Sequence, residues 1–260
     1  MRGDDAGAAA RFADAVAAAP DWAWLQVRLA RARAALGDEP GAVAAAHEAQ
    51  RLAPRWWEAI AAEARAHRDL GHYDLAIEHY RRALELAPEE PALLAELALV
   101  YHVARLDTEA ERYAHAALAL DPDVASARLL LAERALEARD GKAALAEADR
   151  LVSVNPRSVS GQLARADALA LLRRRDEARD GYRKVIALED EAPQHAAPEA
   201  RLAEVRAALA AGKLPAPRGG ARSKQTSRQD PRSPQRSIRD SKPADPTRSP
   251  RPDKDILNGF

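Results

Sequence analysis

The stretch that decides the fold is residues 70–88, LGHYDLAIEHYRRALELAP. Apolar residues recur in it at spacings of three and four, which predicts an amphipathic helix. Gly71 stands before this helix and Pro88 ends it, and both residue types mark helix boundaries. Outward from Pro88, proline recurs at 34-residue intervals, at Pro20, Pro54, Pro122 and Pro156. The chain therefore contains an internal repeat of 34 residues.

Two alanine positions and one leucine-like position keep the same period. Counted from Ala23, repeat positions 8 and 20 are alanine in all five copies, at Ala30, Ala64, Ala98, Ala132 and Ala166 and at Ala42, Ala76, Ala110, Ala144 and Ala178. Position 30 holds Leu52, Leu86, Leu120, Val154 and Leu188. Alanine favours helix and lets two helices cross closely, so each repeat is predicted to be a pair of helices. Gly37 and Gly71 are expected at the turn between paired helices, where a left-handed residue is needed.

This pattern resembles the tetratricopeptide repeat (TPR) family. The best copy is 70–88, with Gly71, Tyr73, Ala76, Tyr80 and Pro88 in the family's positions. The resemblance implies an all-α fold, a right-handed α-solenoid of antiparallel helix pairs. Its five repeats would be 23–56, 57–90, 91–124, 125–158 and 159–192, the last with Asp190 in place of proline. Repeat four also departs from the pattern, because its glycine, Gly141, comes two residues late.

Three other segments flank the five repeats. Residues 1–22 match only the second helix of a repeat, which is either a cap or the remainder of a repeat that begins upstream. Residues 193–212 are predicted to form a C-terminal capping helix that ends at Gly212. Residues 213–260 are rich in Pro, Arg and Ser and are predicted to be a disordered basic tail. The apolar end Ile256-Leu257-Phe260 is either a docking motif or a chance grouping.

The composition and charge of the chain exclude several kinds of protein. The chain has 40 Lys plus Arg and 40 Asp plus Glu, but residues 215–260 carry 11 basic against 5 acidic side chains, so an acidic body bears a basic tail. There is no cysteine, which excludes disulfides and thiolate chemistry. No apolar run approaches a membrane span, and the N-terminus does not read as a secretory signal. We therefore expect a cytoplasmic protein.

The sequence lacks three common catalytic motifs. It has no phosphate-binding glycine loop, no Gly-x-Ser-x-Gly elbow and no His-Glu-x-x-His pair. The seven histidines fall at varied repeat positions and form no ligand set with carboxylates on one helical face. We expect no enzyme activity, no cofactor and no metal site.

The resemblance places the binding surface on the first helix of each pair, which lines a concave groove in the family. The candidate groove residues are basic in the first repeats and acidic with apolar neighbours in the later ones: Trp24, Arg28, Arg31, Arg65, Arg68, Glu96, Leu99, Val103, Leu129, Glu133, Glu137 and Asp167. The alternative is that these charges only solvate an exposed face. Trp22 and Trp56 are 34 residues apart, so they are predicted to pack between repeats, whereas Trp24 is the better binding candidate.

Some TPR proteins clamp the C-terminal carboxylate of heat-shock chaperones with Lys and Asn in this groove. Here position 5 is apolar throughout, and position 9 is Arg31, Arg65, Leu99, Glu133 and Asp167, so we expect no such partner. The predicted function is a protein–protein interaction scaffold or adaptor that binds a partner peptide or helix. Alternatives are an adaptor regulated by its tail folding back onto Glu133, Glu137 and Asp167, a tail that contacts nucleic acid or another polyanion, and an envelope assembly factor if the natural start lies upstream. Because acidic residues interrupt the basic tail, we expect no specific nucleic-acid partner.

Overall fold

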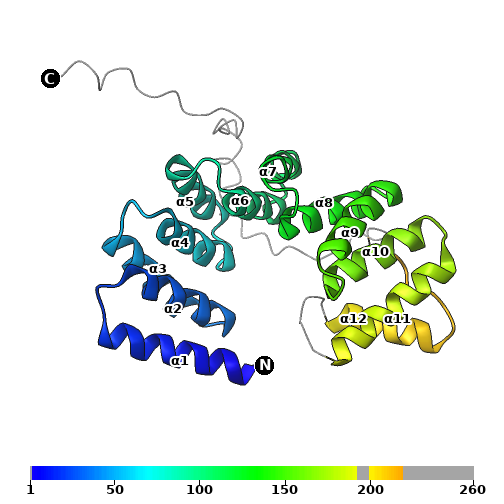
Figure 1. Ribbon diagram of the computed structural model, residues 1–260, viewed down its shortest axis with the longest axis horizontal. Coiled ribbons are helices and arrows are strands. Elements are labelled where there is room, and N and C mark those ends of the chain that lie inside the picture. Colours follow the sequence, from blue (N-terminus) through cyan, green and yellow to red (C-terminus); the bar gives the residue numbers. More distant parts are fainter. Residues whose placement is uncertain (1, 192–198, 219–260) are drawn as a thin grey trace, which may run out of the picture.

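The computed structural model describes residues 2–191 and 199–218, and every regular element in these two ranges is an α-helix (Figure 1). Met1, residues 192–198 and residues 219–260 lie outside the described residues, and with them most of the predicted tail. The helices are α1 (Arg2–Ala18), α2 (Ala23–Ala35), α3 (Glu39–Leu52), α4 (Trp57–Asp69), α5 (Tyr73–Leu86), α6 (Pro91–Val103), α7 (Asp107–Leu120), α8 (Ala125–Glu137), α9 (Gly141–Val154), α10 (Val159–Leu171), α11 (Arg175–Glu191) and α12 (Glu199–Ala210).

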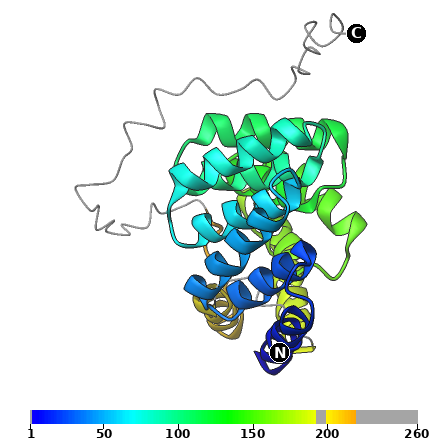
Figure 2. The same cartoon turned by 90° about the vertical axis from the view of Figure 1, so that its left-hand side faces the viewer.

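The helices keep the period of the sequence and stack into an arc. The first helices of the pairs, α2, α4, α6, α8 and α10, each begin 34 residues after the one before, and so do the second helices from α3 to α11. Every extensive contact joins helices that are one or two apart in the chain. Figures 1 and 2 show the result, a curved stack whose two arms descend from α6 and α7 toward α1 on one side and α12 on the other.

Small residues at the helix crossings explain the close packing. All ten alanines at positions 8 and 20 are buried. Alanine at these sites lets the paired helices approach closely. Where the gap is wider, Tyr80 and Tyr182 fill it and are fully buried. The leucine-like register at position 30 differs, because Leu86, Leu120 and Val154 are exposed at the ends of their helices.

The turn inside every repeat contains one residue in the left-handed conformation. Gly37 and Gly71 hold it in the first two repeats, each with φ of 75°. In the later repeats it is held by arginine, with φ of 63° at Arg105, 62° at Arg139 and 60° at Arg173. Gly141, the glycine that comes two residues late in repeat four, therefore does not lie at the turn, which is held by Arg139. Gly141 begins α9, where a Cβ would lie 3.0 Å from Leu172 Cγ, so it serves close packing.

The C-terminal end is packed beyond the predicted start of the tail. Leu202 and Val205 of α12 are buried against the last repeat, and Gly212 ends the helix with a positive φ. Leu214 packs on the same core and Pro215 is buried. The packed chain thus continues to Arg218. No helix among the described residues is both long and apolar enough to cross a bilayer.

Candidate functional site on the concave face

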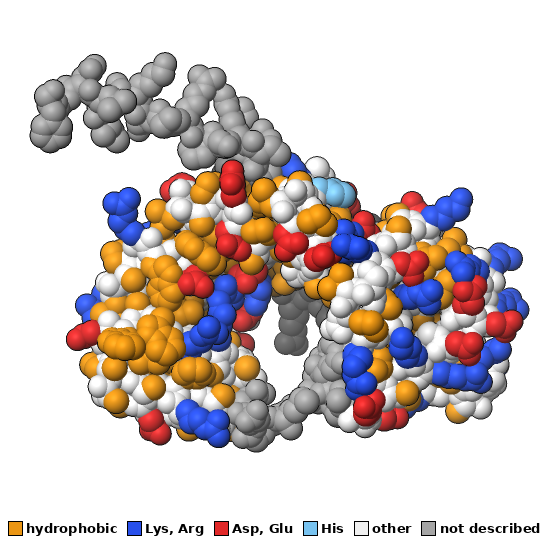
Figure 3. Space-filling model, in the orientation of Figure 1, with side chains coloured by type: hydrophobic (Ala, Val, Ile, Leu, Met, Phe, Trp, Pro, Cys, Tyr) orange, Lys and Arg blue, Asp and Glu red, His pale blue; other side chains and the backbone are white. Residues whose placement is uncertain are grey.

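The N-terminal half of the concave face carries a stripe of one aromatic and two basic side chains on α2. Trp24, Arg28 and Arg31 are four and three residues apart, so they share one face of the helix. All three are exposed, Trp24 by 46%. Neither arginine forms a hydrogen bond or ion pair within the described residues. Figure 3 shows basic side chains along the inner edge of this arm and a broad apolar area beside them.

The charges around Arg31 are of both signs: besides burial, Arg65 and Arg28 lower its pKa, and Glu96 and Glu58 raise it. Its pKa is lowered first by burial and next by the nearby charge of Arg65, while Glu96 acts in the opposite direction. A lowered guanidinium pKa means that the charged form is less well stabilised here than in water. An anion bound beside Arg31 would stabilise its charged form.

On the neighbouring helices α4 and α6, predicted groove residues form ion pairs, so their charges cancel. Arg65 Nε donates to both carboxylate oxygens of Glu96, at 2.9 and 2.7 Å, and the Tyr80 hydroxyl donates to Glu96 at 2.8 Å. Arg68 is paired with Asp69 at 2.8 Å. The unpaired positive charge of the groove is therefore concentrated on α2 rather than shared equally between α2 and α4.

The middle of the groove is apolar. Leu99 and Val103 lie four residues apart on α6 and are 36% and 39% exposed. Leu129 of α8 is half-buried beside the next core cluster. These side chains give the centre of the concave face a contact surface without charge.

At the C-terminal end, the predicted acidic groove residues already have intrachain partners. Asp167 is fully buried and accepts from Tyr182 Oη at 2.7 Å, from Arg218 Nε at 2.7 Å and from Arg201. Arg218 also donates to Glu133 at 3.1 Å. Glu137 instead pairs with Arg134 at 2.6 Å. The first arginine of the predicted tail thus lies against Glu133 and Asp167.

The tryptophans near the first repeat junction are placed differently from the expectation. Trp56 is half-buried and packs against the N-terminal core, as predicted from the repeat. Trp22 does not, because it is 57% exposed, with its ring centroid 6.0 Å from that of Trp24. The two indoles extend the apolar area at the edge of the basic stripe.

The structure also groups three residues that sequence reasoning kept apart. Glu63 and His67 of α4 meet His79 of α5, and their ligand-type atoms all lie within 4.8 Å of one another. Glu63 and His67 are one helical turn apart, but His79 belongs to the other helix of the pair. A comparison of equivalent repeat positions is the signal that finds them, because repeat three has Leu97, Tyr101 and Tyr113 at the same places.

Comparison with known proteins finds one family-model match and several solved structures with a similar fold. Residues 64–103 match the family model of the TPR repeat. No curated protein matches the chain significantly in sequence. Among solved structures, a chain of the APC/C hetero-tetramer Cut9-Hcn1 superposes with a TM-score of 0.63 at 15% identity, covering 73% of this chain and 37% of that one. The Pseudomonas aeruginosa pilF protein gives 0.60 at 20% identity, covering 73% and 84%.

A third structure agrees with the first two. The thermophilic TPR protein TTC0263 of Thermus thermophilus gives a TM-score of 0.59 at 23% identity, covering 65% of this chain and 92% of that one. At such identities the similarity shows the fold, and it matches the helix pairs, the 34-residue period and the all-helical arc found in the described residues. The chain therefore contains a tetratricopeptide repeat at residues 64–103, and its described helices have the fold of TPR proteins.

Proposed function

We propose that the chain is a non-catalytic scaffold or adaptor whose concave face binds an acidic peptide or helix of a partner protein. The binding surface is the stripe of Trp24, Arg28 and Arg31, continued by the apolar pair Leu99 and Val103. The sequence has no phosphate-binding glycine loop, no Gly-x-Ser-x-Gly elbow and no His-Glu-x-x-His pair, and the nearby carboxylates of Glu96 and Asp69 are paired with arginines.

The observation that carries the proposal is the exposure of Arg28 and Arg31, which have no ion-pair partner among the described residues and lie near the cation of Arg65. Guanidinium groups form bidentate hydrogen bonds with carboxylates, and such charge-assisted bonds are about twice as strong as neutral ones. Trp24 adds a rigid aromatic surface of the kind that dominates binding energy at interfaces. A helix or extended segment with acidic residues next to apolar ones matches this surface in charge and polarity.

The test is selection of binders from a display library of random peptides with the full chain as bait. We expect the enriched peptides to carry Asp or Glu next to apolar residues. For a selected peptide, Arg28→Glu together with Arg31→Glu should weaken binding about 10- to 100-fold, since two charge-assisted contacts become repulsive. Trp24→Ala should weaken it about 10-fold.

Arg55→Glu is the matched control, because Arg55 is an exposed arginine at the α3–α4 turn, outside the stripe. Binding by this variant should equal that of the wild type. Selection of peptides without acidic enrichment, or equal affinity for the Arg28/Arg31 double variant and the wild type, would contradict the proposal. Arg65 is a poor test site because reversing its charge also breaks the ion pair with Glu96.

A second candidate role, regulation by the tail, is favoured by the position of Arg218. This residue donates to Asp167 and Glu133, so it competes with any basic partner for the acidic end of the groove. A tethered competitor acts at high effective concentration. The described residues add nothing to the other two roles, a polyanion-binding tail and envelope assembly.

The regulatory role is tested with basic peptides selected in the same way. Arg218→Gln should raise their affinity several-fold, because it frees Glu133 from its intrachain partner. Lys213→Gln, an exposed substitution five residues earlier, is the control and should leave affinity unchanged. No difference between Arg218→Gln and the wild type would remove this role without affecting the acidic-peptide proposal.

A further inference from the structure

The second repeat differs from the others at the contact between its two helices. At repeat positions 7, 11 and 23 it has Glu63, His67 and His79, and repeat three has Leu97, Tyr101 and Tyr113 at the same positions. In repeat three all three side chains are buried, and the two tyrosine rings stack with centroids 5.3 Å apart. In repeat two the histidine rings stack at the same 5.3 Å. The two repeats thus share this packing arrangement, and one carboxylate and two imidazoles in repeat two stand where repeat three has a leucine and two tyrosines.

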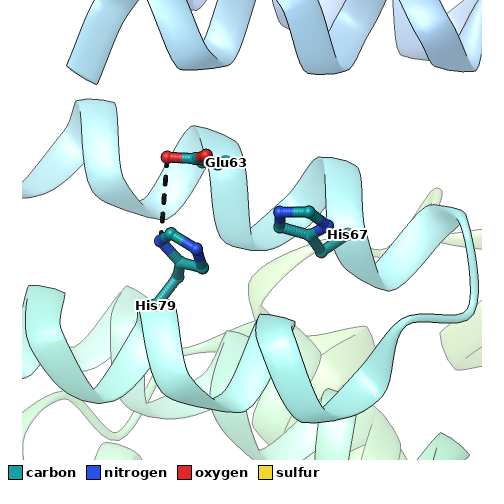
Figure 4. Close-up of side chains that lie close together, drawn as sticks. All are labelled: Glu63, His67 and His79. Carbon is teal, nitrogen blue, oxygen red and sulfur yellow. Dashed lines mark ion pairs between the residues drawn. The ribbon is translucent and has the colours of Figure 1, made fainter. Parts of the chain in front are cut away.

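The three polar side chains point toward one another between α4 and α5 (Figure 4). Glu63 is only 7% exposed, and its one ion pair within the cluster is with His79, at 3.7 Å. The Nδ1 atoms of His67 and His79 are buried and form no hydrogen bond with any described residue. A buried polar atom without a partner carries a desolvation penalty, so two in one cluster indicate a ligand that satisfies both.

We propose that Glu63, His67 and His79 form a binding site for a divalent transition-metal ion, with Zn²⁺ as the probe. Two imidazoles and one carboxylate are a donor set that zinc accepts, with water in the fourth position. Tetrahedral bonds of about 2.0–2.1 Å require ligand atoms about 3.4 Å apart, so atoms that lie within 4.8 Å of one another would close by at most about 1.4 Å. Rotation of half-buried histidine side chains supplies a movement of that size.

The surroundings of Glu63 agree with metal binding. The amide of Gln50 lies against the Glu63 carboxylate, with Arg82 beyond it. Partners of this kind orient a ligand carboxylate.

Other repeats show what the ligands replace. The equivalent positions are Leu29, Arg33 and Ala45 in repeat one, and Leu131, Ala135 and Glu147 in repeat four. Neither set offers three donor groups. A metal in repeat two would therefore link α4 to α5 at a point where repeat three relies on aromatic packing.

The experiment is titration of the metal-free full-length chain with Zn²⁺ in competition with a chromophoric chelator, followed by Co²⁺ substitution to read the coordination from its visible absorption. We expect one ion per chain and a visible spectrum typical of four-coordinate cobalt. His67→Ala and His79→Ala should each weaken binding at least about 10-fold. His115→Ala removes an exposed histidine of α7 and should change nothing.

The chain also supplies its own apolar replacement. Glu63→Leu combined with His67→Tyr and His79→Tyr gives repeat two the side chains of repeat three, and this variant should remain helical and lose the site. If the triple variant does not fold, the single histidine variants decide the question. Zinc binding that is no tighter in the wild type than in His67→Ala and His79→Ala would overturn the proposal.

Discussion

At the turns of repeats three to five, Arg105, Arg139 and Arg173 hold φ near +60°, where the first two repeats have glycine. A side chain with a Cβ is strained in this region by about 1–2 kcal/mol, and glycine is not. The turn geometry is thus imposed by the packing of the helix pair rather than chosen by the local sequence. The left-handed conformation is preserved even where arginine, which disfavours it, occupies the turn.

Arg139→Gly should therefore raise the free energy of unfolding by about 0.5–1 kcal/mol, because relief of strain exceeds the extra entropy that glycine gives the unfolded chain. The reverse change in repeat one, Gly37→Arg, should lower it by a similar amount. Urea unfolding followed by circular dichroism measures both. A loss of stability in Arg139→Gly would show that the arginine side chain contributes more than the strain removes.

At the scale of the helices, Asp167 ties the last full repeat to the segment that covers it. Its carboxylate is fully buried and meets one group from α11, Tyr182, one from α12, Arg201, and one from the following segment, Arg218. A buried carboxylate with several donors stabilises only while all its partners remain. Loss of the Asp167 carboxylate leaves the almost completely buried Arg201 with Glu204 as its remaining acidic partner.

Asp167→Ala should accordingly lower the free energy of unfolding by about 3–5 kcal/mol. Asp149→Ala is the control, because its ion pair with Arg165 lies at the surface and is worth at most about 1 kcal/mol. Chemical denaturation of both variants tests the difference. A loss below about 1 kcal/mol for Asp167→Ala would mean that Arg201 and Arg218 find other partners.

Four tyrosines of the helix interfaces make stability sensitive to alkali. Burial raises the pKa values of Tyr80, Tyr101, Tyr113 and Tyr182 above the usual 10.0. Because the folded pKa is higher, the unfolded chain loses these protons first. Stability is then complete below pH 10 and falls as pH rises toward the folded values.

Each such tyrosine should contribute about 1.4 kcal/mol of lost stability per pH unit above 10. Urea unfolding at pH 9, 10 and 11 gives the slope for the wild type. Tyr80→Phe should reduce that slope by the contribution of one tyrosine, about 1.4 kcal/mol per pH unit, whatever its effect on the free energy of unfolding at pH 9. An unchanged slope in Tyr80→Phe would contradict the conclusion that the pKa of Tyr80 is raised in the folded protein.

At the scale of the whole molecule, stability is distributed along the arc rather than gathered in one core. Extensive contacts join only neighbouring helices, and the buried residues form successive clusters along the chain. The largest cluster spans α4 to α8. In such an array each repeat is stabilised by its own packing and by its neighbours.

Hydrogen exchange should therefore be slowest in α4 to α7 and fastest in the terminal helices α1 and α12, each of which has extensive contacts with one other helix alone. Mass spectrometry of peptides after timed exchange measures the order. Uniform protection along the described helices would indicate that the arc unfolds as one unit.

The sequence predicts this architecture well because its signals are local and repeated. The alanines at positions 8 and 20 and the prolines at 34-residue intervals fix the period, and helix pairs follow from it. Arginine at the left-handed turns gives no such signal, since it is common on any helix surface. The Glu63–His67–His79 cluster and the contact of Arg218 with Glu133 join residues on different elements, so only the packed arc brings them together. The pairing of Arg65 with Glu96 likewise depends on the angle between α4 and α6.

The contact of Arg218 also determines how the molecule bears load. Its two acceptors, Glu133 and Asp167, lie on α8 and α10, 85 and 51 residues earlier in the chain. A pull applied through the residues after Arg218 therefore reaches α8 and α10 before it can peel α12 from the end of the stack. Arg218 therefore transfers tension to α8 and α10 and protects the packing of α12 against the last repeat from that force.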